Sequence, residues 1–102
     1  MKRASISEIS ETIHGIKRSF EATVAFIETR FDNVPEHNLK VLKEIIDSDR
    51  NTINYIARVA SIGKEFPLND KHIERMQNAF EHVHFASSNI LKAFMTSIST
   101  RR

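Results

Sequence analysis

Two Glu-x-x-His spacings are the arrangement best suited to chemistry in this sequence. The pairs are Glu11 with His14 and Glu81 with His84. A spacing of three places both side chains on one face of a helix, and carboxylate-bridged di-metal bundles combine two such pairs with a Glu from each of two further helices. In that arrangement Glu28 or Glu44 would supply the additional carboxylates.

The apolar residues around these pairs argue against a metal site. In a helix the apolar stripe marks the face that packs inward, and in both stretches this stripe leaves the Glu on the outer side. His14 also falls outside, and His84 falls at the flank. Because di-metal ligands must point into the bundle, we expect solvated faces of mixed charge, with neither a metal nor another cofactor.

Other catalytic arrangements lack the context that they require. The sequence has no cysteine, which excludes disulfides, thiolate zinc sites and a cysteine nucleophile. Its two glycines are too few for a phosphate-binding loop, and no strand-turn-helix pattern supports a serine nucleophile. We therefore expect a protein that is not an enzyme.

The elements that carry these residues are expected to be three long helices. The clearest is the stretch 70–99, where large apolar residues recur at steps of three and four and Ser87 fills the one gap. Its stripe consists of Ile73, Met76, Phe80, Val83, Ile90, Phe94 and Ile98. Similar stripes predict helices over about residues 6–31 and 36–62. The first stripe consists of Ile6, Ile9, Ile13, Ile16, Phe20, Val24, Ile27 and Phe31, and the second of Leu39, Leu42, Ile46, Ile53, Ile56 and Ala60.

Local signals set the expected helix ends. Ser5 and Glu8 match a capping box at the start of the first helix, and Asn69 is expected to cap the third. Gly63 is a natural end for the second helix. Within that helix, Asp47–Thr52 is a run of six polar residues, which leaves open a kink or a break.

We predict an all-α fold, an antiparallel up-down-up bundle of three long helices that forms a single domain over residues 1–102. The length of 102 residues suits one domain. Two Gly and two Pro are few, which fits long helices with short connections and argues against an all-β fold.

One end of this bundle has more apolar residues than its seam can bury. They are Ala22, Ala25, Phe26, Val41, Ile45, Phe85, Ala86, Leu91, Ala93 and Met95. An exposed apolar patch on a small protein marks an interface more often than not. We therefore predict a protein-protein interaction module, such as an adaptor, chaperone-like factor, inhibitor or small regulatory subunit, that binds another protein or forms a homodimer. The expected partner-binding residues are Phe26, Phe85, Leu91 and Met95.

The alternative is a small nucleic-acid-associated protein or ribonucleoprotein subunit. The formal net charge is +2, and basic residues alternate with acids along the predicted helices, which dilutes the charge. The residues that would contact nucleic acid are Lys2, Arg3, Lys17, Arg18, Lys40 and Lys43. No stretch approaches the roughly 18 apolar residues of a membrane span, so we expect a cytoplasmic protein that does not bind membranes.

Overall fold

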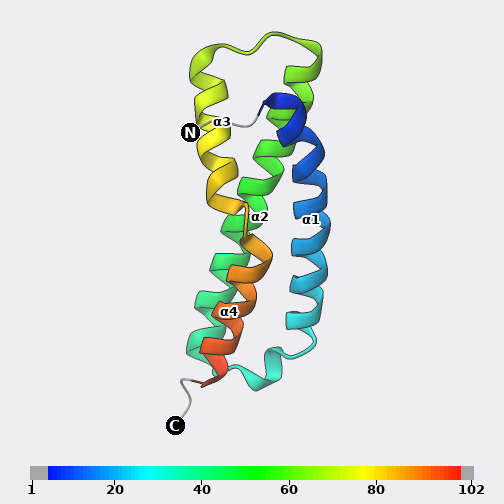
Figure 1. Ribbon diagram of the computed structural model, residues 1–102. Coiled ribbons are helices and arrows are strands. Elements are labelled where there is room, and N and C mark those ends of the chain that lie inside the picture. The colour runs from blue at the N-terminus through cyan, green and yellow to red at the C-terminus, as the bar shows by residue number, and fades with distance from the viewer. Residues whose placement is uncertain (1–4, 100–102) are drawn as a thin grey trace.

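The computed structural model describes residues 5–99, which form an all-α structure without strands in that range (Figure 1). The elements are α1 (Ile6–Glu28), the 3₁₀ turn η1 (Phe31–Asn33), α2 (Glu36–Glu65), α3 (Asp70–Val83) and α4 (Ala86–Ser99). The bundle measures 52 × 22 × 21 Å. The all-α class is confirmed, whereas the predicted count of three long helices is wrong, because the third is divided into α3 and α4.

The helices form three antiparallel columns, with α3 and α4 following each other along one of them (Figure 1). η1 lies at one end of the bundle, and the connection from α2 to α3 lies at the other. α1 packs mainly against α2 and α4, while α3 packs mainly against α2. The C-terminal half of α1 and all of α4 therefore lie side by side at the η1 end.

The third predicted helix is interrupted at His84 and Phe85, between α3 and α4. Six of the seven residues from His82 to Ser88 are His, Val, Phe or Ser, which are weaker helix formers than Ala, Leu, Lys or Glu. Serine also favours helix starts over helix interiors. We attribute the interruption to this weak segment, because it contains neither proline nor glycine.

The interruption decides which residue fills the gap in the apolar stripe. Ala86 is buried and fills the gap where Ser87 was expected. The prediction that Ala86 is one of the apolar residues left exposed at this end of the bundle was therefore wrong. Ser87 is half-buried, and its hydroxyl oxygen lies 2.8 Å from that of Ser19 in α1. This serine pair joins α1 to the start of α4.

α2 is continuous through the polar segment Asp47–Thr52. Arg50 within it binds Glu21 of α1, and its Nε and Nη2 each donate to one carboxylate oxygen at 2.8 Å. The Thr52 hydroxyl donates to the carbonyl of Ser48 one turn earlier. These contacts satisfy polar side chains at a turn that lacks an apolar residue, so the helix does not break.

Both predicted N-caps are confirmed. The Glu8 amide donates to Ser5 Oγ at 3.2 Å, and the Ser5 amide donates back to Glu8 Oε1 at 2.8 Å. Asn69 accepts from the His72 amide at 2.8 Å at the start of α3. The first helix is shorter than predicted, since α1 ends at Glu28 and the chain then turns through η1 into α2.

Gly63 does not end α2, contrary to the prediction. The helix continues to Glu65, and Gly63 does not adopt the positive φ of a C-terminal glycine cap. A Cβ at this position would lie 2.8 Å from Leu68 Cδ1 and 3.3 Å from Ile6 Cγ2. Gly63 therefore serves close packing, because side chains from α1 and from the connection to α3 lie against it.

The core runs along the whole seam of the bundle. Its fully buried large side chains are Ile9, Ile13, Phe20, Val24, Ile27, Leu42, Ile53, Ile56, Met76, Val83 and Ile90. All of them belong to the apolar stripes that the sequence predicts. The core therefore fixes the faces that α1 and α4 turn outward, and these faces form the site described next.

Candidate functional site

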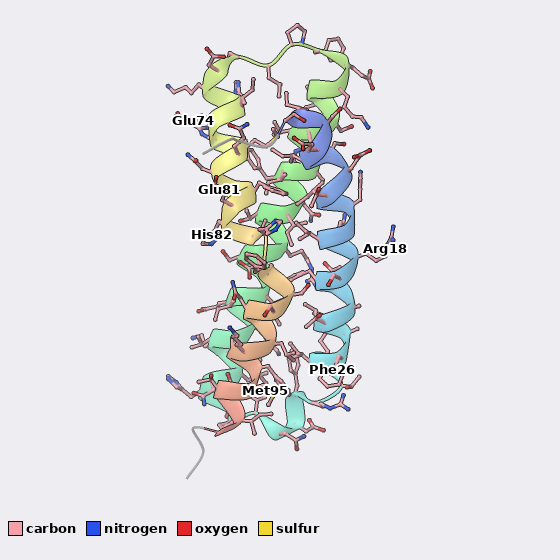
Figure 2. All side chains as sticks on the ribbon, in the orientation of Figure 1. Arg18, Phe26, Glu74, Glu81, His82 and Met95 are labelled. Carbon is pink, nitrogen blue, oxygen red and sulfur yellow. The ribbon has the colours of Figure 1, made fainter. Side chains whose placement is uncertain are left out.

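An apolar groove lies between the C-terminal half of α1 and α4, and it has a volume of about 760 Å³. Its lining residues are Ala22, Thr23, Phe26, Arg30, Asn33, Leu91, Phe94, Met95 and Ile98. Arg30 is the one charged residue among them. Figure 2 shows Phe26 and Met95 at nearly the same level of the two facing helices. We call this surface the α1–α4 groove.

Helical spacing produces both walls of the groove. Ala22 and Phe26 are one turn apart on α1, and Arg30 follows one turn later, just beyond the end of the helix. Leu91 and Met95 are one turn apart on α4. Residues at this spacing share a helix face, and these two faces adjoin the core stripes without belonging to them. The groove is thus the margin of the α1–α4 packing seam.

Phe26 is held in place although 45% of it is exposed. Its ring meets the ring of Phe94 edge to face, with centroids 6.4 Å apart. The guanidinium carbon of Arg30 lies 3.9 Å from the Phe26 ring centroid, and Arg30 Nη1 donates to the Phe26 carbonyl at 3.2 Å and to the Thr29 hydroxyl at 2.8 Å. An aromatic side chain ordered before binding loses less conformational entropy when a partner docks.

The structure brings together three of the four residues that sequence reasoning selected for partner binding. Phe26, Leu91 and Met95 line the α1–α4 groove, with 39% of Leu91 and 60% of Met95 exposed. Phe85 is 66% exposed but lies outside the groove. Sequence reasoning missed Arg30, although its four-residue spacing from Phe26 was visible.

Phe85 belongs to a separate hollow at the interruption between α3 and α4. This hollow has a volume of about 450 Å³ and is lined by Glu11, Thr12, Gly15, Ile16, Ser19, His84, Phe85 and Ser87. The His84 ring lies edge to face against Phe85, with centroids 4.6 Å apart, and against Phe80 at 5.3 Å. The two histidine contacts connect this exposed ring to the core.

Val41 and Ile45 are exposed on α2 and border a third hollow, which His82 of α3 also lines. Asp49 lies in the same hollow and is half-buried. Burial raises the pKa of the Asp49 carboxyl, and the charge of His82 opposes this shift. These α2 residues therefore do not extend the α1–α4 groove.

Two further apolar residues are exposed at the opposite end of the bundle. Ile62 is 47% exposed near the end of α2, and Phe66 is 63% exposed in the connection that follows. Sequence reasoning placed the surplus apolar residues at the η1 end alone and gave these two no role. Phe66 directly follows the end of α2 at Glu65.

Both Glu-x-x-His pairs lie on exposed faces. Glu11 and His14 are exposed on α1, and Glu81 is exposed on α3 with His84 just after its end. Figure 2 shows Glu74, Glu81 and His82 along the outer side of α3. Within residues 5–99, no three His, Cys, Asp or Glu side chains are grouped so that they could hold a metal ion.

The basic residues proposed for nucleic acid are not gathered at one level. Lys17 and Arg18 lie in the middle of α1, whereas Lys40 and Lys43 lie near the start of α2. Glu21 of α1 and Arg50 of α2 form an ion pair, so they lie at the same level of the bundle. Because the two helices are antiparallel and rise 1.5 Å per residue, Lys17 and Lys43 lie on opposite sides of this level, roughly 16 Å apart along the bundle. Lys2 and Arg3 lie outside the described residues.

No protein-family model matches the chain, and comparisons with curated proteins and with solved structures find no match. Among the described residues, no helix is both long enough and apolar enough to cross a membrane. The function is therefore inferred from the geometry and charge of the chain itself.

Proposed function

We propose that this chain is a non-enzymatic interaction module that binds a helix of another protein, or of a second copy, in the α1–α4 groove. The observation that supports the proposal is the meeting of Phe26, Leu91 and Met95 on one concave, apolar surface. Large apolar side chains around a groove are the usual receptor for the apolar face of an amphipathic helix.

The chemical character of the three anchors fits this role. Phe26 is an aromatic residue already ordered by Phe94 and Arg30, which lowers the conformational entropy lost on binding. Met95 is an unbranched, polarisable side chain that adapts to irregular partner surfaces. Because the basic residues of α1 and α2 lie at different levels, an apolar partner surface fits this chain better than a phosphate backbone does.

The test is affinity capture from the native host with three forms of the full chain. Met95→Glu places a charge in the groove, and Asn89→Glu places the same charge on an exposed position of α4 that does not line it. Wild-type and Asn89→Glu chains are expected to retain the same specific partner, identified by mass spectrometry, and Met95→Glu is expected to lose it. Light scattering of each form scores self-association in parallel.

A partner retained equally by all three forms would contradict the proposal, because the groove would then play no part in binding. Circular dichroism supplies the folding control. Met95 is 60% exposed, so Met95→Glu should keep the helical spectrum of the wild type. A loss of helicity would show that Met95 is part of the core and would also contradict the proposal.

A further inference from the structure

The α1–α4 groove has a cation on each side. Arg30 lines the α1 wall. On α4, Lys92 is exposed and lies next to Leu91 and one turn before Met95, so it flanks the same face. Within residues 5–99 the ion pairs are those of Arg50, so neither Arg30 nor Lys92 is paired with an acid there.

The α1 and α4 faces that form the groove lack acidic side chains; the acid beside the groove is Asp32 of η1, which lines an adjoining hollow with the groove residues Asn33 and Ile98. α4 contains no Asp or Glu, and the sequence has none after Glu81. In the C-terminal half of α1, Glu21 and Glu28 are placed roughly 200° around the helix from Phe26. Glu21 faces α2, where Arg50 holds it at 2.8 Å. The two helix walls of the groove are therefore apolar with positive rims, and the carboxyl of Asp32 lies beyond them at the η1 end.

This charge pattern disfavours a second copy as the occupant. A two-fold dimer places the same surface of both chains in contact. Pairing through the groove would thus bring two Arg30 and two Lys92 side chains around one apolar seam without an acid among its lining residues. Like charges at an interface reject a partner.

The shape of the groove favours a helix over a small ligand. Sites for small molecules usually enclose most of the ligand surface, but 45% of Phe26 and 60% of Met95 remain exposed here. A helix can cover such an open surface along its length. We infer that the occupant is an amphipathic helix of another protein whose apolar stripe is flanked by Asp or Glu. This inference rests on the proposed function of the groove.

The probes are two synthetic peptides of about 18 residues, or five helical turns. Both carry the same stripe of Leu and Ile, flanked by Glu in the acidic peptide and by Lys in the basic peptide. Fluorescence anisotropy measures the binding of each labelled peptide to the full chain. Because each rim cation attracts one peptide and repels the other, the acidic peptide is expected to bind at least roughly tenfold more tightly.

Charge variants test whether Arg30 and Lys92 cause the preference for the acidic peptide. Lys92→Glu is expected to reduce the preference for the acidic peptide severalfold. Lys71→Glu makes the same charge change at an exposed position near the start of α3, at the end of the bundle away from η1, and it should leave the preference nearly unchanged (Figure 1). Arg30→Gln is expected to weaken the acidic peptide without reversing the order.

The outcomes separate the two proposals. Equal binding of both peptides, tighter binding of the basic peptide, or no binding of the acidic peptide at millimolar concentration would overturn the acidic-helix inference. If Met95→Glu still abolished capture of the host partner, the proposed function would stand. A wild-type dimer that Met95→Glu dissociates would show that the occupant is a second copy. Peptide binding unaffected by Met95→Glu would show that the groove is not the binding site, which would contradict both proposals.

Discussion

Replacing each glycine of this chain with alanine should have different consequences for stability. Both glycines lie inside helices, Gly15 in α1 and Gly63 in α2. A Cβ at Gly15 would have no heavy atom within 4 Å beyond its own surroundings on the helix, whereas a Cβ at Gly63 would lie 2.8 Å from Leu68 Cδ1 and 3.3 Å from Ile6 Cγ2. Alanine therefore gains helix propensity at both sites, but its methyl group overlaps neighbouring side chains only at position 63.

The magnitudes follow from this difference in space. Alanine is favoured over glycine in a helix interior by about 1 kcal/mol, so Gly15→Ala should raise the free energy of unfolding by about that amount. For a domain of this size the melting temperature should rise by roughly 4–8 °C. Overpacking a filled site costs about 1–3 kcal/mol, so Gly63→Ala should be neutral or destabilising.

Urea denaturation followed by circular dichroism measures both changes, with the m-value as the check on two-state unfolding. A double variant should show additive effects, since the two sites share no neighbours. Stabilisation by Gly63→Ala equal to that by Gly15→Ala would refute the packing of Leu68 against α2. Destabilisation by Gly15→Ala would show that another backbone approaches α1 at that turn.

Three further substitutions test the polar contacts and the core. The Arg50 hydrogen bonds lower the pKa of Glu21 below its ordinary 4.5, so their contribution is present above that pH and is lost as the pH falls through the lowered value. Glu21→Gln should reduce the unfolding free energy by up to about 1 kcal/mol at neutral pH, and denaturation across pH should show the difference disappearing in acid. Burial raises the pKa of Asp49 above 3.8, which makes its ionised form unfavourable in the folded state; Asp49→Asn should stabilise modestly at neutral pH and not at low pH. Ile90→Ala removes a fully buried side chain and should cost about 2–5 kcal/mol in thermal or urea unfolding, while Leu91→Ala at the exposed groove should cost far less.

Apolar spacing was sufficient to predict most of the fold. The stripes of the three expected helices contain the buried apolar side chains other than Val34 and Ala86, because a period of 3.6 identifies an inward face without further information. The caps at Ser5 and Asn69 were also predictable, since each needs only the identity of one or two neighbouring residues. These features are local, and local patterns determine them.

The features that sequence reasoning missed depend on contacts between distant segments or on a balance of weak propensities. Gly63 looks like a helix end until Leu68 and Ile6 are placed against it. The interruption at His84 and Phe85 follows from several mediocre helix formers in succession, and none of them is a breaker by itself.

The candidate site was predictable in composition but not in extent. Phe26, Leu91 and Met95 were identified because they are large, apolar and outside the main stripes. Their gathering with Arg30 into one groove requires α4 to pack beside α1, which depends on the bundle as a whole. Phe85 met the same criterion, and the interruption beside it places it on another surface.

Amide hydrogen exchange of the full chain, with and without its captured partner, shows which surface the partner covers. If the partner docks in the α1–α4 groove, residues 22–30 and residues 91–98 of α4 should gain protection, with little change around the other exposed apolar residues. Protection centred on Val41 and Ile45, or on Ile62 and Phe66, with the α1–α4 groove unchanged, would contradict docking in this groove.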